Sequence, residues 1–131
     1  MRLSYRRQFF FLMTSKVPCY LRTLRKKWEL TQKELASLVP RGRRSRVSDV
    51  ERGKIPPRAS ELLAYALIFG LPPQAIFRKY AEEIEDAVMR GAAELDRRLA
   101  DDDSPSAARK IDFLEQLSNR VRLEASEIPN L

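Results

Sequence analysis

Apolar residues recur every three or four positions through most of the chain, which is the spacing of residues along one face of an α-helix. The pattern starts with Leu21, Leu24 and Trp28, which predict a helix over about residues 19–28 with these side chains in the core. No segment of useful length alternates between apolar and polar residues as a strand does. The pattern therefore predicts an all-α protein.

Two short helices follow, over about residues 32–38 and 44–52. Thr31 and Glu34 have the spacing of a capping box, in which each side chain accepts a hydrogen bond from the other residue's backbone N–H. Gly53 suits a left-handed C-terminal cap and is expected to end the second helix. The positions expected to face inward are Leu35, Ala36, Val39, Val47 and Val50.

The most apolar segment, ELLAYALIF, lies in a helix expected over about residues 60–69. Ser60 suits its N-cap and Gly70 its end. Because this helix is apolar nearly all round, we expect it to form the buried centre of a domain. Pro73 then opens a fifth helix, since the first turn of a helix tolerates a residue without a backbone donor.

A long apolar stripe continues beyond the fifth helix. Its members are Phe77, Tyr80, Ile84, Val88, Gly91, Leu95 and Leu99, with spacings of 3, 4, 4, 3, 4 and 4 residues. Ala87, Gly91 and Ala92 would allow another helix to approach closely. A stripe of this length requires a partner surface.

The last helix is expected over about residues 105–122, with Ser104 as its N-cap and Pro105 at its first position. Residues 124–131 are expected to fray. Its apolar face consists of Ile111, Leu114, Leu117 or Ser118, and Val121. This helix is one candidate partner for the stripe, and a second copy of the chain is the other. The pattern alone gives the two comparable weight.

Positive charge is concentrated on the segment that holds the two short helices. The 131 residues have a net charge of +7, and residues 21–58 contain twelve Lys or Arg against four acids. Residues 1–20 add four basic residues and no acid, whereas residues 59–131 have nine basic and fourteen acidic residues. This asymmetry indicates a polyanion-binding face joined to a C-terminal part with a different task.

The composition excludes several kinds of site. The chain has no histidine and one cysteine, Cys19, which removes the usual zinc ligand sets, an internal disulfide framework and catalysis by His or Cys. The acidic residues at 82–86 and 101–103 mostly face solvent on a helix or lie at a helix end. We therefore expect no enzyme activity, no catalytic residue, no metal and no cofactor.

Residues 1–18 are expected to be a flexible N-terminal extension. The apolar run from Phe9 to Met13 is too short for a signal peptide or a membrane span, and Met13 is an alternative start of the protein. These features, with the single cysteine, favour a cytoplasmic protein without a membrane partner.

Several of these residues together resemble a known family. They are Leu21, Leu24, Arg25, Thr31-Gln32, Glu34-Leu35-Ala36, Val47-Ser48, Val50-Glu51-Arg52-Gly53-Lys54, Pro57, Leu62-Leu63 and Phe69-Gly70-Leu71. The segment resembles the helix-turn-helix domain of phage repressors and Cro proteins, the XRE-like family of bacterial regulators. The resemblance implies a five-helix repressor-like DNA-binding domain at residues 19–77, followed by a helical extension at 78–131. Between Ala36 and Glu51 the chain has one residue more than the common family spacing, so the turn is expected to be longer or bulged.

The resemblance also implies roles for individual residues. Helix 44–52 would lie in the major groove of DNA, with Arg44 and Ser45 at base edges and Arg44 as the main reader of a G·C-containing half-site. Asp49 would either accept from cytosine or orient a neighbouring arginine. Gln32 would hold a backbone phosphate, and Arg25 would pair with Glu51 in a buried ion pair. Further candidate DNA contacts are Arg41, Arg43, Arg46, Ser48, Arg52 and Lys54.

Three functions are consistent with this pattern. The first is a sequence-specific transcriptional regulator that binds double-stranded DNA, as a homodimeric repressor paired through residues 78–131. The second is an antitoxin that binds its promoter through residues 21–77 and a toxin, or another protein partner, through residues 78–131. The third is a protein-interaction module that does not bind DNA.

Overall fold

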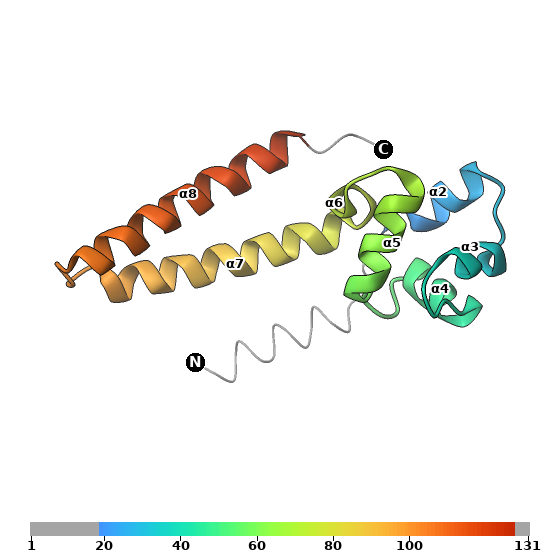
Figure 1. Ribbon diagram of the computed structural model, residues 1–131, viewed down its shortest axis with the longest axis horizontal. Helices are drawn as coiled ribbons and strands as arrows, with labels where there is room; N and C mark the ends of the chain where they lie inside the picture. Colours follow the sequence, from blue (N-terminus) through green and yellow to red (C-terminus); the bar gives the residue numbers. More distant parts are fainter. Residues whose placement is uncertain (1–18, 128–131) are drawn as a thin grey trace. The chain divides into compact units, whose positions relative to one another are not determined.

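The computed structural model describes residues 19–127, and this part of the chain is all-α, with seven helices and no strand. The helices are α2 (Leu21–Lys27), α3 (Gln32–Leu38), α4 (Arg44–Glu51), α5 (Ala59–Phe69), α6 (Pro73–Ile76), α7 (Arg78–Leu99) and α8 (Pro105–Glu127). Their contacts divide the described residues into two compact units, 19–81 and 82–127. Figure 1 shows the short helices α2 to α6 in the first unit and the long helices α7 and α8.

The first unit is built on one apolar core. Leu21, Leu35 and Tyr65 are fully buried in it, one from each of α2, α3 and α5. The remaining buried members are Leu24, Ala36, Val39, Val47, Val50, Ile76 and Phe77. The inward positions that the sequence predicts for α3 and α4 are therefore correct. The backbone N–H of Tyr20 donates to the carbonyl of Ile76 at 2.9 Å, so the two ends of the unit are joined.

Two helix-ending signals act as the sequence predicts. Thr31 and Glu34 form the capping box of α3, with N···O distances of 3.1 Å and 3.0 Å. Gly53 follows α4 with a φ of 67°, which an L-residue with a side chain seldom adopts. These two signals fix where α3 begins and where α4 stops.

The expectation that Trp28 belongs to the core is wrong. Helix α2 ends at Lys27, and Trp28 occupies its C-cap with 65% of its surface exposed. The ammonium nitrogen of Lys27 lies 6.0 Å from the centre of the Trp28 ring. The i, i+3, i+7 spacing therefore extends this helix one residue too far at its C-terminal end, because the chain leaves the helical path just before Trp28.

Two expectations for α5 are also wrong. The helix begins at Ala59, so Ser60 lies within its first turn, and Arg58 is the N-cap. The helix is not buried all round, since Leu63 and Leu67 are 70% and 84% exposed while Tyr65 is fully buried. In a domain of this size α5 covers one side of the core, so its outer face stays outside despite its apolar composition.

The second unit contains the hairpin of α7 and α8. Its buried residues are Leu99, Ala107 and Leu114, with Ala92 packed against them. Ser104 caps α8 by accepting from the backbone N–H of Ala107 at 3.1 Å, as predicted. Helix α8 continues to Glu127, beyond the predicted end at residue 122, so residues 124–127 are helical.

Part of the predicted apolar packing in this unit is absent. Ile111 is 38% exposed, and Ile84, Val88 and Leu95 of the α7 stripe are 37–44% exposed. Leu99 alone among the stripe residues of this unit is buried. The intramolecular hairpin therefore covers the stripe at one end only.

The two ends of the chain lie outside the described residues. These ends include residues 1–18, with Met13 as an alternative start, and the last four residues, so the expectations for them stay predictions. Within residues 19–127, no helix has the length and apolar character needed to cross a membrane.

Candidate nucleic-acid interface

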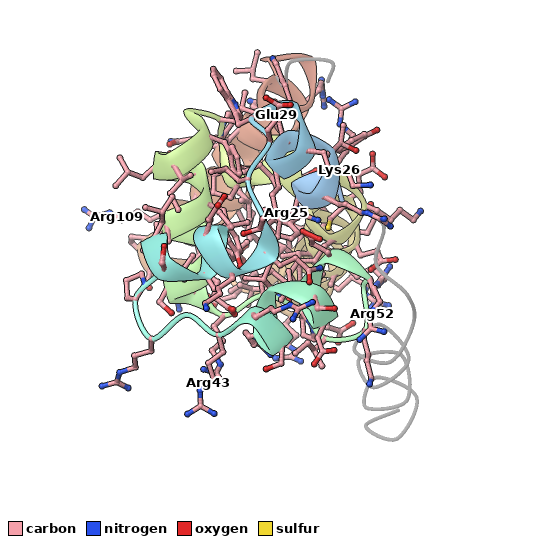
Figure 2. The ribbon with its side chains drawn as sticks, turned by 90° about the vertical axis from the view of Figure 1, so that its right-hand side faces the viewer. Arg25, Lys26, Glu29, Arg43, Arg52 and Arg109 are labelled. Atoms are coloured by element: carbon pink, nitrogen blue, oxygen red, sulfur yellow. The ribbon has the colours of Figure 1, made fainter. Side chains whose placement is uncertain are left out.

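The exposed face of α4 carries the residues that the sequence predicts as base readers. Arg43 precedes the helix as its N-cap, and Arg44 and Ser45 form its first turn. All three are exposed, as is Arg41 in the preceding turn. Figure 2 shows Arg43 and Arg52 extending away from the domain on the same side as α4. The start of α4 thus presents cationic and hydroxyl donors outward, next to the unpaired backbone N–H groups of its first turn.

Arg46 does not belong to this exposed face, in contrast to the sequence-based expectation. Its guanidinium turns back toward α5, where Nε lies 3.1 Å and 3.0 Å from the two carboxylate oxygens of Glu61 and Nη2 lies 2.7 Å from Oε1. Nη2 also donates to the carbonyl of Pro56 at 2.9 Å. Because the Glu61 side chain is only 6% exposed, this arginine neutralises a buried carboxylate.

Glu61 has a second task at the start of α5. Its Oε1 accepts from the backbone N–H of Arg58 at 2.7 Å, so one carboxylate joins Arg46 to the helix that follows. Hydrogen bonding to Glu61 raises the pKa of Arg46 above its ordinary value. The sequence does hold a signal for this pair, because Glu61 is the one charged residue in an otherwise apolar helix. Sequence reasoning missed it.

A second ion pair lies at the other end of α4. Arg25 donates from Nε to Glu51 Oε2 at 2.7 Å and from Nη2 to Oε1 at 3.0 Å, in the arrangement that the family resemblance implies. Nη1 of Arg25 donates to the carbonyl of Leu30 at 2.7 Å, which ties the end of α2 to the same site. The Glu51 side chain is 1% exposed. The hydrogen bond to Glu51 raises the pKa of Arg25.

Gln32 and Cys19 make further contacts at the Arg25–Glu51 end of α4. The amide nitrogen of Gln32 donates to Glu51 Oε1 at 3.1 Å, so the first residue of α3 contacts the end of α4. The thiol of Cys19 donates weakly to the carbonyl of Val50 at 3.6 Å, and burial raises the pKa of this thiol. Glu51 therefore connects α4 with both α2 and α3.

Asp49 and Arg52 form an ion pair on the surface of α4, with Arg52 Nη2 at 3.0 Å from Asp49 Oδ1. Asp49 thus orients an arginine in this structure, which is one of the two roles that the sequence leaves open. Ser48 is half-buried beside them, and Lys54 is exposed just after the helix. The arginine itself is 64% exposed and available to a phosphate.

The turn between α3 and α4 has five residues, 39–43, where helix-turn-helix units usually have three or four. Arg41 adopts a φ of 57°, and the backbone N–H of Gly42 donates to the carbonyl of Val39 at 2.9 Å. A Cβ atom on Gly42 would lie 1.9 Å from the carbonyl oxygen of Ala36. The turn is therefore long, as predicted, and it closes tightly because residue 42 has no side chain.

Two shallow hollows lie along α4. One is lined by Arg41, Gly42, Arg43, Ser45, Arg46, Asp49 and Arg58, and the other by Gln32, Arg44, Ser45, Ser48, Asp49 and Arg52. Every predicted DNA contact except Lys54 lines one of them. Arg58 is exposed beside the first hollow and is a cation that sequence reasoning did not include. Within residues 19–127, no group of three or more His, Cys, Asp or Glu is placed to hold a metal ion.

These features define a compact helical domain with two helices joined by a turn, the second of which has an exposed, arginine-rich start. Residues 19–76 match the family described as "Helix-turn-helix domain", and this segment is a helix-turn-helix domain of the XRE-like family. The domain implies DNA binding, and the family is not typically catalytic. Comparisons with curated proteins and with solved structures found no match.

Proposed function

We propose that this protein is a sequence-specific regulator of transcription that inserts α4 into the major groove of double-stranded DNA. The observation that carries the proposal is that the arginines at the start of α4 differ in their contacts. Arg43 and Arg44 are exposed at its start, whereas Arg46 is bound to Glu61 and holds the helix in place. Ion pairs at both ends of α4 keep its exposed face rigid, which reduces the entropy lost on binding.

Arg44 is the main base reader in this proposal. A guanidinium in the major groove donates two hydrogen bonds to guanine O6 and N7, and each such pair discriminates against a wrong base by about 1–3 kcal/mol. Ser45 and Arg43 lie close enough to contact neighbouring bases or phosphates. The proposed half-site therefore contains a G·C pair opposite the first turn of α4.

Phosphates would be bound on both sides of this contact. Gln32 lies at the N-terminus of α3, where unpaired backbone N–H groups favour an anion. The exposed cations around α4 that would join it are Arg41, Arg52, Arg58 and Lys54. Such contacts position the protein without reading sequence.

Repression by a dimer is the regulatory mode that we propose. One α4 contacts too few base pairs to select a site in a genome, and two copies on half-sites about one helical turn apart remove that limit. A dimer seated on a promoter occludes it. The second unit, residues 82–127, provides the helices through which two copies pair.

Titration of fluorescent duplex DNA with the full-length chain, over a range of salt concentrations, tests DNA binding. We expect the logarithm of affinity to fall linearly with the logarithm of salt concentration, with a slope near −0.9 for each phosphate contacted. Arg44→Ala and Arg52→Ala provide matched variants. The first should relax base preference, and the second should weaken all duplexes alike. Absence of duplex binding at low salt would refute the proposed function.

A further inference from the structure

The one tryptophan of the chain lies on the surface of the first unit. Trp28 is the C-cap of α2, and 65% of its surface is exposed. The ring of a tryptophan is largely buried in most proteins, because leaving so much apolar area in water gives up the free energy of its burial. Tryptophan is also among the residues enriched at the energetic centres of protein–protein interfaces. The proposed DNA contacts do not include this ring.

The turn that holds Trp28 outward is fixed by hydrogen bonds. The backbone N–H of Glu29 donates to the carbonyl of Lys26 at 3.0 Å. The backbone N–H of Leu30 donates to the carbonyl of Arg25 at 3.1 Å, and Nη1 of Arg25 donates to the carbonyl of Leu30 at 2.7 Å. The two backbone bonds form a Schellman motif, and Glu29 occupies its left-handed position with a φ of 56°, where glycine is less strained. The exposed ring is therefore part of an ordered turn.

Positive charge surrounds the ring. The ammonium nitrogen of Lys27 lies 6.0 Å from the ring centre, within the range of a cation–π contact. Lys26 is exposed two residues before the ring, and Glu29 is the one acid of this turn. Residues 21–58, to which the turn belongs, contain twelve Lys or Arg against four acids. The Trp28 surface, which we define as Lys26, Lys27 and Trp28, therefore attracts an acidic partner and repels a basic one.

The Trp28 surface and the exposed face of α4 lie on different sides of the first unit. Figure 2 shows Lys26 and Glu29 on the upper side of this unit, and Arg43 and Arg52 on its lower side. In Figure 1 the turn after α2 also lies above α4. A duplex seated against α4 would leave the Trp28 surface open, so a second macromolecule could bind there at the same time.

We propose that the Trp28 surface binds an acidic segment of a partner protein. Apolar side chains of this segment pack on the exposed ring, and its carboxylates pair with Lys26 and Lys27. Because the turn is already ordered, little conformational entropy is lost when the ring is covered. The inference goes beyond the proposed function, since it assigns a protein partner to the side of the domain that DNA does not use.

Selection from a library of random peptides tests the surface. The full-length chain is the bait, and peptides that also bind Trp28→Ala are removed, because acidic peptides can bind the cations of α4 as well. We expect the remaining peptides to carry carboxylates beside apolar residues and to bind Trp28→Ala at least about tenfold more weakly than the native chain. Trp28→Phe keeps an apolar ring and should retain most of the affinity. Leu67→Ala, at an equally exposed apolar position of α5, is the control and should retain all of it.

Two results of this selection would overturn the inference. One is that no peptide distinguishes the native chain from Trp28→Ala while circular dichroism shows both to be folded. The other is that the distinguishing peptides are basic or uncharged, because the lysines would then have no part in the contact.

Charge reversal tests the role of the lysines. At physiological salt Lys26→Glu should weaken binding of the selected peptides at least about threefold, and it should leave affinity for duplex DNA unchanged. Lys54→Glu, the same change just after α4, should weaken DNA binding and leave peptide binding unchanged. Equal effects of the two variants on peptide binding would contradict a contact at the Trp28 surface.

Fluorescence reports the ring directly, because Trp28 is the one tryptophan of the chain. A selected peptide should move its emission to shorter wavelength, since the ring leaves water. Duplex DNA alone should leave the emission unchanged, as should a rise in protein concentration without peptide. A shift caused by DNA would place the ring in the DNA contact, and a shift with protein concentration would place it between two copies of the chain. Either shift would overturn the inference.

The same measurements separate this inference from the proposed function. If the native chain binds the selected peptides as predicted but binds no duplex, the proposed function falls and the Trp28 surface stands. If the chain binds duplex DNA but no peptide distinguishes it from Trp28→Ala, the Trp28 surface falls and the proposed function stands.

Discussion

Arg25 and Glu51 show how one buried pair fixes the orientation of a helix. The Glu51 side chain accepts from Arg25 and from Gln32, so its charge is satisfied only when α2, α3 and α4 are all in place. Such a pair contributes to position more than to net stability, since two charges must leave water to form it. Removal of only one partner leaves the other charge buried and unpaired, which lowers the free energy of unfolding.

Substitution of Arg25 by alanine should therefore lower the free energy of unfolding by about 3–5 kcal/mol, because Glu51 stays buried without its cation. Arg22→Ala, on the exposed side of the same helix, is the control and should change it by less than about 0.5 kcal/mol. Urea unfolding followed by circular dichroism measures both. Equal effects of the two substitutions would show that the pair does not anchor the domain.

Arg44 and Arg46 are two residues apart and should respond in opposite ways. Arg46→Ala deprives the buried Glu61 of its charged donor and should cost about 1.5–3 kcal/mol of stability. Arg44→Ala removes an exposed side chain and should leave stability unchanged while it weakens DNA binding. Thermal unfolding and DNA titration on the same samples compare them. Full stability of Arg46→Ala would contradict the role assigned to its contact with Glu61.

Tyr65 makes stability depend on alkaline pH. Burial, with a smaller contribution from the charge of Glu61, raises the pKa of its phenol above the ordinary value of 10.0. Above pH 10 the unfolded chain loses this proton and the folded chain keeps it, so the stability from the neutral phenol is complete below pH 10 and is lost as pH rises beyond it.

At pH 11 this loss should reach about 1.4 kcal/mol relative to pH 8. Tyr65→Phe cannot ionise and should lack this part of the decline, whereas other groups contribute equally to both proteins. Urea unfolding of the two proteins between pH 8 and pH 11 gives the difference. Parallel curves would mean that Tyr65 ionises as readily in the folded state as in the unfolded state.

At the scale of elements, local signals in the sequence located most helices. The capping box at Thr31, the glycine at position 53 and the cap at Ser104 act through neighbouring backbone atoms, so the sequence contains all that is needed. The predictions are wrong where contacts with residues distant in the sequence determine the structure. Trp28 has the correct spacing for the core, but the chain leaves the helix before it.

The exposed face of α5 and the pairing of Arg46 could not be predicted from periodicity either. Leu63 and Leu67 are apolar, and only the packing of the other helices leaves them outside. The position of Arg46 among Arg43, Arg44 and Ser45 predicts a DNA contact, whereas its partner in the structure is Glu61, fifteen residues away in another helix. The family resemblance, by contrast, supplied the pair between Arg25 and Glu51, which local spacing alone does not reveal.

The turn between α3 and α4 gives a prediction at this scale. Gly42→Ala places a methyl group 1.9 Å from the Ala36 carbonyl oxygen, so the backbone must move, and the substitution should cost at least about 1–3 kcal/mol. Gly91→Ala is the matched control. It meets no atom within 4 Å and should raise helix stability by up to about 1 kcal/mol in the monomer. Thermal unfolding of both variants measures the change in stability. If Gly42→Ala leaves stability unchanged, the turn is not closely packed.

At the scale of the whole molecule, the proposed function assigns different tasks to the basic and acidic parts of the sequence. The first unit carries the excess of positive charge that binding to a polyanion requires. The second unit carries an apolar face on α7 that one copy leaves partly uncovered. In the proposed function, α4 of the first unit reads bases and the second unit pairs two copies, so that two half-sites are bound together.

Selection of binding sites from random duplexes, with the native chain and Arg44→Ala in parallel, tests the central claim most directly. The native chain should enrich paired half-sites that each contain a conserved G·C pair. Arg44→Ala should enrich the same half-sites with that position relaxed, by a discrimination equivalent to about 1–3 kcal/mol. An unchanged preference at every position in the Arg44→Ala selection would contradict the assignment of Arg44 as the base reader.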